Sequence, residues 1–149
     1  MTPAAPLIRE ARFEEFDPQT LYSLLQLRSE IFVVEQDCVY LDLDGRDTEP
    51  QTRHFWIDDG GRVLSALRLL RDEHYERIGR VVTAAAARGQ GLSSRLLAHT
   101  LEASSGPWIL SGQLHLAPWY ERFGFGARGD DYLEDGIPHI CMVRPAINR

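Results

Sequence analysis

A short glycine-containing turn, residues 88–91 with the sequence RGQG, is the part of this chain best suited to bind a ligand. It lies between an apolar run ending in residues 81–83, which predicts a strand, and a pattern from Leu92 onward that predicts an amphipathic helix. Such a turn points backbone N–H groups and the positive end of the helix dipole at one spot, and its glycines let a bulky group approach the backbone. Arg88 adds a permanent positive charge. The pattern favours a pyrophosphate-binding loop; the alternative is a glycine turn that only caps the helix.

Three phosphate-binding motifs share this general pattern, and spacing separates them. The dinucleotide fingerprint G-x-G-x-x-G requires a glycine three residues after Gly91, where the chain has Ser94. The nucleotide P-loop requires a lysine, and all 16 basic residues of this chain are arginines. The loop resembles the third motif, R-x-x-G-x-[GA], which binds the pyrophosphate of coenzyme A in the GNAT N-acetyltransferases. Arg88 and Gly91 match it, and Ser93 stands where the family usually has glycine or alanine.

A second segment, residues 119–125 with the sequence WYERFGF, resembles the [FY]-Y-E-x-x-G-F motif of the same family. The resemblance implies that Tyr120 protonates the departing CoA thiolate, and a tyrosine with an ordinary pKa near 10 is protonated at neutral pH. Gln113 falls where many relatives have an asparagine that faces the cofactor. Taken without the glycine loop, Tyr120 is also consistent with a core aromatic residue whose hydroxyl is hydrogen-bonded.

Three further segments are similar to the ElaA-like branch of the GNAT family: residues 21–28, 32–36 and 134–140. The resemblance implies the α/β GNAT acyl-CoA N-acyltransferase fold, a central mixed, mostly antiparallel sheet of six to seven strands flanked by about four helices. It also implies one N-acetyltransferase domain over residues 1–149, acetyl-CoA as the cosubstrate, and a homodimer, since family members are often dimers.

The same resemblance assigns a role to each part of the glycine loop. Backbone groups of the strand before the loop bind the pantetheine arm of the cofactor, and the loop with the first turn of the helix binds its pyrophosphate. The implied cofactor-binding residues are Val81, Val82, Thr83, Arg88, Gly89, Gln90, Gly91, Leu92, Ser93, Ser94 and Gln113.

Acetyl transfer to an amine requires a neutral amine, so a base or a water chain must remove a proton before the thioester is attacked. Glu35 is the first candidate base, because partial burial would raise its pKa; the alternative is a carboxylate in water or paired with Arg28 or Arg53. His139 is the second candidate base and, with Arg28, a candidate for binding the acceptor; a structural histidine bonded to a backbone carbonyl is the alternative. Cys38 is disfavoured as a nucleophile, because the family reaction is a direct transfer without an acyl-enzyme.

Composition excludes several classes of protein. The chain has 149 residues, a net charge of −6 and no lysine, which excludes Schiff-base enzymes. An acidic chain without a basic tail argues against nucleic-acid binding through phosphate contacts. No apolar segment predicts a signal peptide or a membrane span, and two distant cysteines predict free thiols. A cytoplasmic protein without a membrane partner is therefore expected.

An acidic, irregular loop is expected over residues 35–53, as a solvated face or as a field that attracts a cationic acceptor. A calcium loop is excluded, because positions 6 and 12 counted from Asp42 are Asp47 and Arg53 instead of glycine and glutamate. No metal site is predicted.

Hydrophobic periodicity and turn residues predict the remaining elements. Helices are expected over residues 18–33, from 92 to a stop at 106–107, and over 116–123. Strands are expected over residues 7–13, 54–57, 63–70, 78–83, 108–111 and 139–143.

The sequence thus predicts an N-acetyltransferase that transfers the acetyl group of acetyl-CoA to a primary amine of a small molecule or a peptide, by direct attack in a ternary complex. Two alternatives stay open: a non-catalytic sensor or scaffold that binds CoA or acyl-CoA, and an acyltransferase that uses a longer acyl-CoA.

Overall fold

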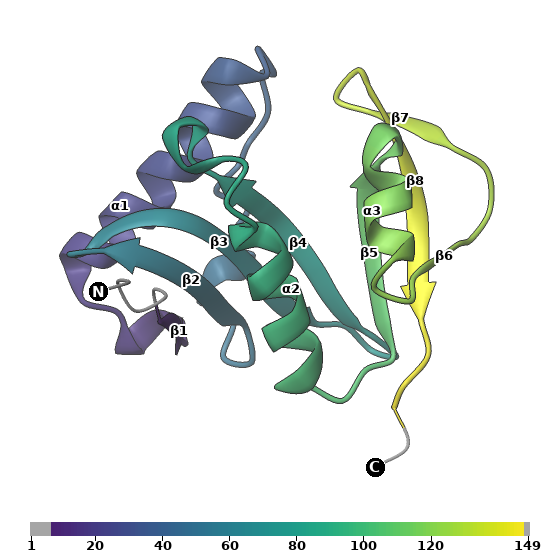
Figure 1. The fold of residues 1–149 in the computed structure, drawn as a ribbon, viewed down its shortest axis with the longest axis horizontal. Coiled ribbons are helices and arrows are strands. Elements are labelled where there is room, and N and C mark those ends of the chain that lie inside the picture. Colours follow the sequence, from purple (N-terminus) through teal and green to yellow (C-terminus); the bar gives the residue numbers. More distant parts are fainter. Residues whose placement is uncertain (1–6, 148–149) are drawn as a thin grey trace.

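The computed structural model describes residues 7–147, which form a mixed sheet of eight strands with helices on both faces (Figure 1). The order across the sheet is β1-β2-β3-β4-β5-β8-β6, and β7 also pairs with β8. Neighbouring strands are antiparallel except β4 and β5, which are parallel. The strands are β1 (Ile8–Ala11), β2 (Arg53–Asp59), β3 (Arg62–Arg71), β4 (Glu76–Thr83), β5 (Trp108–Gln113), β6 (Gly126–Ala127), β7 (Tyr132–Glu134) and β8 (Ile137–Arg144).

Three α-helices flank the sheet in the described residues: α1 (Pro18–Arg28), α2 (Leu92–Glu102) and α3 (Ala117–Glu121). α1 begins where the Asp17 carboxylate accepts a hydrogen bond from the Thr20 amide, with proline in the first turn, as the Asp-Pro pair predicts. The chain then continues as a π-helical turn, Ser29–Glu35, so the helical segment ends two residues beyond the expected Val33.

α1 and α2 pack on opposite faces of the sheet, because successive side chains of a strand point to opposite faces. In β2, Phe55 and Ile57 contribute to the core under α2, whereas Trp56 contributes to the core under α1. α3 covers β5 on the α2 face, where Tyr120 and Phe125 complete the larger core (Figure 1).

The predicted fold class is confirmed, and the differences lie in its smallest elements. The sheet has more than the expected six to seven strands, because β6 and β7 pair with β8. These strands are two and three residues long, which is too short to show an alternating pattern. Short 3₁₀ turns stand at Arg46–Thr48, in the segment expected to be irregular, and at Ala85–Ala87, before the glycine loop.

β4 and β5 separate soon after they meet, and this opens the middle of the sheet (Figure 1). Their parallel register covers only two residue pairs, at the start of both strands. On its other edge β4 contains a bulge: between the partners of Ala66 and Arg68, β4 has one residue more than β3, and Arg80 there has a left-handed φ of 50°. Because a bulge bends and twists its strand, the second half of β4 turns away from β5.

Buried arginines hold the acidic loop that follows the π-helical turn. Arg28 of α1 is 1% exposed and donates to Asp42 at 2.9 Å and to Asp47 at 2.7 Å. Arg68 of β3 donates to Asp47 at 3.1 Å and to Asp44 at 2.6 Å. The loop is therefore fixed to a helix and a strand by charged hydrogen bonds.

A third arginine completes this Arg–Asp cluster, defined as Arg28, Arg68, Arg80, Asp42, Asp44 and Asp47. Arg80 of β4 lies 2.9 Å from Asp42 and 3.3 Å from Asp44, and the Tyr40 hydroxyl donates to Asp42 at 2.7 Å. The expectation of a solvated face or an attractive acidic field is therefore wrong for Asp42, Asp44 and Asp47, because three arginines match their charges.

Arg28→Ala is expected to lower the free energy of unfolding by about 3 kcal/mol or more, because removing one partner leaves buried carboxylates short of their cation. Urea denaturation measures the change. Arg9→Ala is the control, since Arg9 is half exposed in its ion pair with Asp58 and should cost less than about 1 kcal/mol. Equal losses in the two variants would contradict a structural role for the cluster.

The cluster also makes stability depend on acid pH. Burial alone would raise the pKa of Asp47, but the charges and hydrogen bonds of Arg28 and Arg68 outweigh it and lower that pKa. The unfolded chain therefore binds the proton of Asp47 more readily than the folded chain does. The contribution of Asp47 to the free energy of unfolding is complete above the ordinary aspartate pKa of about 3.9 and is lost as the pH falls below that value. Asp47→Asn should therefore destabilise the protein at pH 7 and differ less from the wild type at pH 3, as measured by urea denaturation.

Candidate active site

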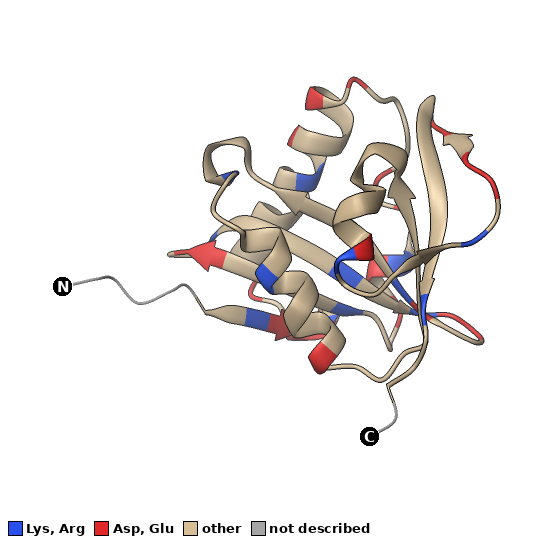
Figure 2. Cartoon of the chain, turned by 45° about the vertical axis from the view of Figure 1, so that its right-hand side comes forward, with Lys and Arg blue, Asp and Glu red and all other residues tan. Residues whose placement is uncertain are grey.

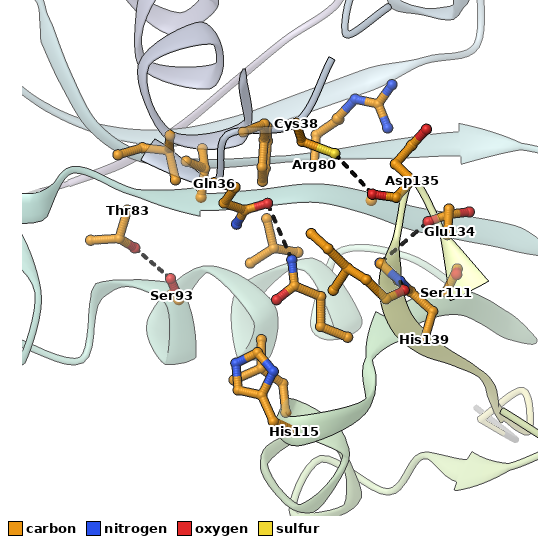
Figure 3. Close-up of a pocket in the computed structure, with 18 of the residues that line it drawn as sticks. Gln36, Cys38, Arg80, Thr83, Ser93, Ser111, His115, Glu134, Asp135 and His139 are labelled. Carbon is orange, nitrogen blue, oxygen red and sulfur yellow. Dashed lines mark hydrogen bonds and ion pairs between the residues drawn. The ribbon is translucent and has the colours of Figure 1, made fainter. Parts of the chain in front are cut away.

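A cavity of about 850 Å³ lies where β4 and β5 diverge. One wall comes from the π-helical turn, the loop up to Tyr40 and the second half of β4; the other comes from β5, α3 and the turn between β7 and β8. In Figure 3, Thr83 and Ser93 lie at one end, and Cys38, Glu134, Asp135 and His139 lie at the other. We call these the loop end and the hairpin end.

The glycine loop has the geometry of an anion cradle. Gly89 and Gly91 have φ values of 81° and 73°, which favour glycine, and Gly91 is the N-cap of α2. Among residues 7–147 no side chain caps this helix, so the amides at its N-terminus are not occupied by a capping group. A second cavity of about 230 Å³ adjoins these groups and is lined by Arg88, Ser93 and Trp119 as well. Free amides, a helix N-terminus and an arginine around one space fit the pyrophosphate of CoA.

Arg88 is bound by Glu35 across the mouth of the cavity. The two guanidinium N–H groups lie 2.7 and 2.8 Å from the two carboxylate oxygens, and both side chains are more than 40% exposed. The hydrogen bond from Arg88 lowers the pKa of Glu35. The expectation that burial raises this pKa is therefore wrong, because Glu35 lies at the surface and pairs with Arg88 rather than with Arg28 or Arg53.

A chain of hydroxyls joins the loop to the sheet. The Ser65 hydroxyl donates to the Val82 carbonyl at 2.9 Å, so it accepts from Thr83, also at 2.9 Å. Thr83 must then accept from Ser93 at 2.5 Å, because its only hydrogen is already donated. Ser93, the departure from the family motif, thus fastens the first turn of α2 to the end of β4.

Tyr120 is buried beside the cavity that it lines. Within residues 7–147 its hydroxyl has no hydrogen-bond partner, and burial raises its pKa to about 12. Its ring lies close to Gly112 of β5, where an added Cβ would come within 2.9 Å of it. The hydroxyl is therefore protonated and free to donate to a bound molecule.

Two glutamines bridge the cavity. The Gln113 amide of β5 donates to Gln36, which follows the π-helical turn, at 3.4 Å. Gln113 lines the cavity. The Cys38 thiol also crosses the gap and donates to the Asp135 carbonyl at 3.2 Å, and burial raises its pKa. A protonated thiol is a poor nucleophile, which agrees with the disfavoured role of Cys38.

The histidines and Arg28 have different surroundings. His139 lines the hairpin end and is 8% exposed, and its Nδ1 lies 2.7 Å from the Ile137 carbonyl. His115 also lines the cavity, whereas His54 is buried beside the Asp47 carbonyl. Arg28 does not line the cavity, because its guanidinium is buried in the Arg–Asp cluster. The expectation that Arg28 binds the acceptor is therefore corrected.

The sequence interpretation missed Tyr40, Ser111, Glu134 and Asp135 as cavity residues. A signal for Glu134 was present: the pair Asp135-Gly136 is typical of a two-residue hairpin turn, and both residues have positive φ values. Such a turn pairs Glu134 with Ile137 and brings it near His139.

Acidic and basic residues are interspersed over the helices, strands and loops of the described residues (Figure 2). Within that part of the chain, no group of three or more His, Cys, Asp or Glu side chains is arranged to hold a metal ion. None of its helices has the length and apolar character needed to cross a membrane.

Comparison with known proteins identifies relatives over nearly the whole chain. The family model of the acetyltransferase (GNAT) domain matches residues 22–145. UPF0039 protein Rv2851c of Mycobacterium tuberculosis is 45% identical over 144 residues, which cover 93% of this chain and 92% of that protein. Protein ElaA of Escherichia coli is 39% identical over 149 residues, covering 93% of this chain and 96% of ElaA.

Solved structures of related proteins have the same fold as this chain. An acyl-CoA N-acyltransferase from Pseudomonas aeruginosa has a TM-score of 0.90 and 42% identity, covering 95% of this chain and 100% of that one. The crystal structure of E. coli ElaA has a TM-score of 0.88 and 36% identity, covering 93% of this chain and 99% of the ElaA chain. The fold and these neighbours define an acyltransferase that uses CoA thioesters. The chain belongs to the GNAT acetyltransferase family and, within it, to the ElaA-like branch.

Arg88→Ala is expected to weaken CoA binding about 10- to 100-fold, because hydrogen bonds to a charged group contribute about 1.5–3 kcal/mol. Glu35→Gln should strengthen CoA binding by up to about fivefold, because it removes the carboxylate that competes with CoA for Arg88. The gain is limited because an exposed ion pair contributes less than about 1 kcal/mol. Isothermal titration calorimetry with CoA measures both. Equal weakening in the two variants would mean that the pair acts only as a structural unit.

Proposed function

We propose that this protein transfers the acetyl group of acetyl-CoA to a primary amine by direct attack in a ternary complex. The observation that carries the proposal is the Tyr120 hydroxyl, which is protonated, has no protein partner in the described residues and lines the same cavity as the glycine loop. A donor at this point can assist a leaving group while the loop holds the other end of the same cosubstrate.

The loop would bind the cofactor through Arg88, Gly89, Gln90, Gly91, Leu92, Ser93 and Ser94. Arg88 would exchange its surface partner Glu35 for phosphate oxygens. The edge of β4 at Val81, Val82 and Thr83 faces β5 across the cavity and would hydrogen-bond the pantetheine amides as a neighbouring strand does. When bound, the cofactor supplies the acyl thioester.

Tyr120 would donate a hydrogen bond and then its proton to the sulfur as negative charge develops there. Its raised pKa keeps the hydroxyl protonated over the whole physiological range, so the donor is present at every turnover. Gln113, held across the gap by Gln36, would face the cofactor. Glu35 is not proposed as the base, because a surface carboxylate with a lowered pKa accepts protons poorly.

Thiol release from acetyl-CoA, measured with benzylamine, spermidine, free amino acids and a short peptide with an unblocked N-terminus, tests the proposal. Release that depends on an added amine, with a product heavier by one acetyl group, is expected. Tight CoA binding without release from any amine would favour a non-catalytic CoA-binding module. Faster release from a longer acyl-CoA would replace the acetyl group in the proposal.

Tyr120→Phe should lower turnover by about 10- to 100-fold, the range of a single proton-transfer residue. CoA affinity should change little, since Tyr120 does not line the loop cavity. The phenylalanine ring keeps the packing against Phe125 and Trp119. Unchanged turnover would exclude Tyr120 as the proton donor.

A further inference from the structure

The hairpin end of the cavity contains a histidine–carboxylate pair with a fixed arrangement. His139 of β8 and Glu134 of β7 both line the cavity, and Nε2 of His139 lies 3.3 Å from the Glu134 carboxylate (Figure 3). The ring of Tyr132 stacks on the imidazole, with the planes 23° apart. The Tyr132 hydroxyl is in turn hydrogen-bonded to Ser111 of β5. Two strands and an aromatic ring therefore hold the histidine in place.

The hydrogen bonds decide which nitrogen of His139 exchanges protons. A carbonyl oxygen only accepts, so Nδ1, at 2.7 Å from the Ile137 carbonyl, must be the protonated nitrogen. In the neutral ring Nε2 then carries a lone pair, which faces a carboxylate oxygen of Glu134. Two acceptors at this distance repel unless a proton lies on Nε2 or a bound molecule donates one N–H group to each of them.

The two arginines that line the cavity are already paired with carboxylates. Arg80 is held by Asp42 and Asp44, and Arg88 is held by Glu35. Glu134 has no arginine partner among the described residues, and its side chain is 51% exposed. It is therefore accessible to a cation that enters the cavity.

We propose that Glu134 and His139 form the subsite for the acceptor, a protonated primary aliphatic amine: Glu134 binds the ammonium ion and Nε2 of His139 takes one of its protons. An ammonium group has three N–H donors, so it can satisfy both acceptors at once. This inference rests on the proposed function and names the substrate class and the base for it.

The proton count balances. The ammonium gives one proton to Nε2 of His139 and becomes a neutral amine, whose nitrogen forms a bond to the thioester carbonyl carbon. When the carbon–sulfur bond breaks, Tyr120 protonates the thiolate and recovers a proton from the nitrogen. The products are the amide and the CoA thiol, and His139 returns its proton to solvent. No oxidant or further reactant is needed.

Several titratable groups contact His139 or line the same cavity. On its own side of the cavity these are Tyr132 and Glu134 of β7 and Asp135 in the turn. On the opposite wall they are Cys38, Tyr40 and Arg80. The pH dependence of turnover in a His139 variant must therefore be compared with that of the wild type.

His139→Asn is the main test, since its amide can still donate to the Ile137 carbonyl; His139→Gln is the second variant. With the most active panel amine, turnover at pH 7 should fall by about 100-fold. The ratio of wild-type to variant turnover should fall about tenfold for each pH unit toward the pKa of the amine. The reason is that the variant depends on the neutral fraction of the amine, which rises about tenfold per pH unit in this range. A purely structural histidine would give a deficit that does not depend on pH.

Glu134→Gln should raise KM for the amine by about tenfold with a smaller effect on kcat, because it removes the charge that binds the ammonium. The matched controls are His74→Gln and Glu73→Gln, an exposed histidine–glutamate pair in the β3–β4 turn that lies outside the cavity. Both should behave as the wild type. Thermal unfolding and CoA calorimetry confirm that each variant is folded.

A measurement of amine binding distinguishes the proposed acetyl transfer from the proposed amine subsite. Benzylammonium should bind the wild type in an NMR titration and bind Glu134→Gln more weakly, whether or not acetyl transfer occurs. No thiol release with intact amine binding would reject the proposed function alone. Unchanged KM and amine binding in Glu134→Gln, or a pH-independent deficit in both His139 variants, would reject the subsite.

Discussion

Beyond their first two residue pairs, β4 and β5 expose facing edges to each other in the middle of an eight-stranded sheet. Backbone N–H and C=O groups at such edges need hydrogen-bond partners, and burying them without partners is costly. A molecule with amide groups can take the place of the missing strand. The cavity, the position of the glycine loop at the end of β4 and the distance between the two walls all follow from this separation.

The separation must be held open by parts of the fold outside the strands. The Arg–Asp cluster does this on one side, because it fixes α1, the acidic loop and the bulged residue Arg80 to each other. All the cations in the cluster are arginines, whose planar guanidinium can bond two carboxylates at once. On the other side, α3 and the β7–β8 hairpin pack on β5 and β8. The candidate active site is thus a gap between two halves of the sheet, each held by its own contacts.

Local patterns predicted most of the fold and the glycine loop at the end of β4. The glycine loop and its arginine lie in one contiguous motif, so their relation depends on a few residues of backbone. Tyr120 belongs to a second motif that is recognised by its own short spacing, but the fold places it beside the cavity. The environments of Glu35 and Arg28 could not be predicted in this way. Their partners, Arg88 and the acidic loop, come from 53 residues and 14 to 19 residues away in the chain, and charge pairing at that range depends on how the elements pack.

The sequence by itself determined the fold family, the loop that can bind a pyrophosphate and the absence of any lysine chemistry, because each depends on residue type and short spacing. Only the tertiary structure decided which charges are free. It buries Arg28 together with Asp42 and Asp47, pairs Glu35 with Arg88, and leaves Glu134 facing Nε2 of His139 in the cavity. The physical reason is that the ionisation and availability of a side chain depend on the dielectric and the partners around it, and these are set by contacts between distant parts of the chain.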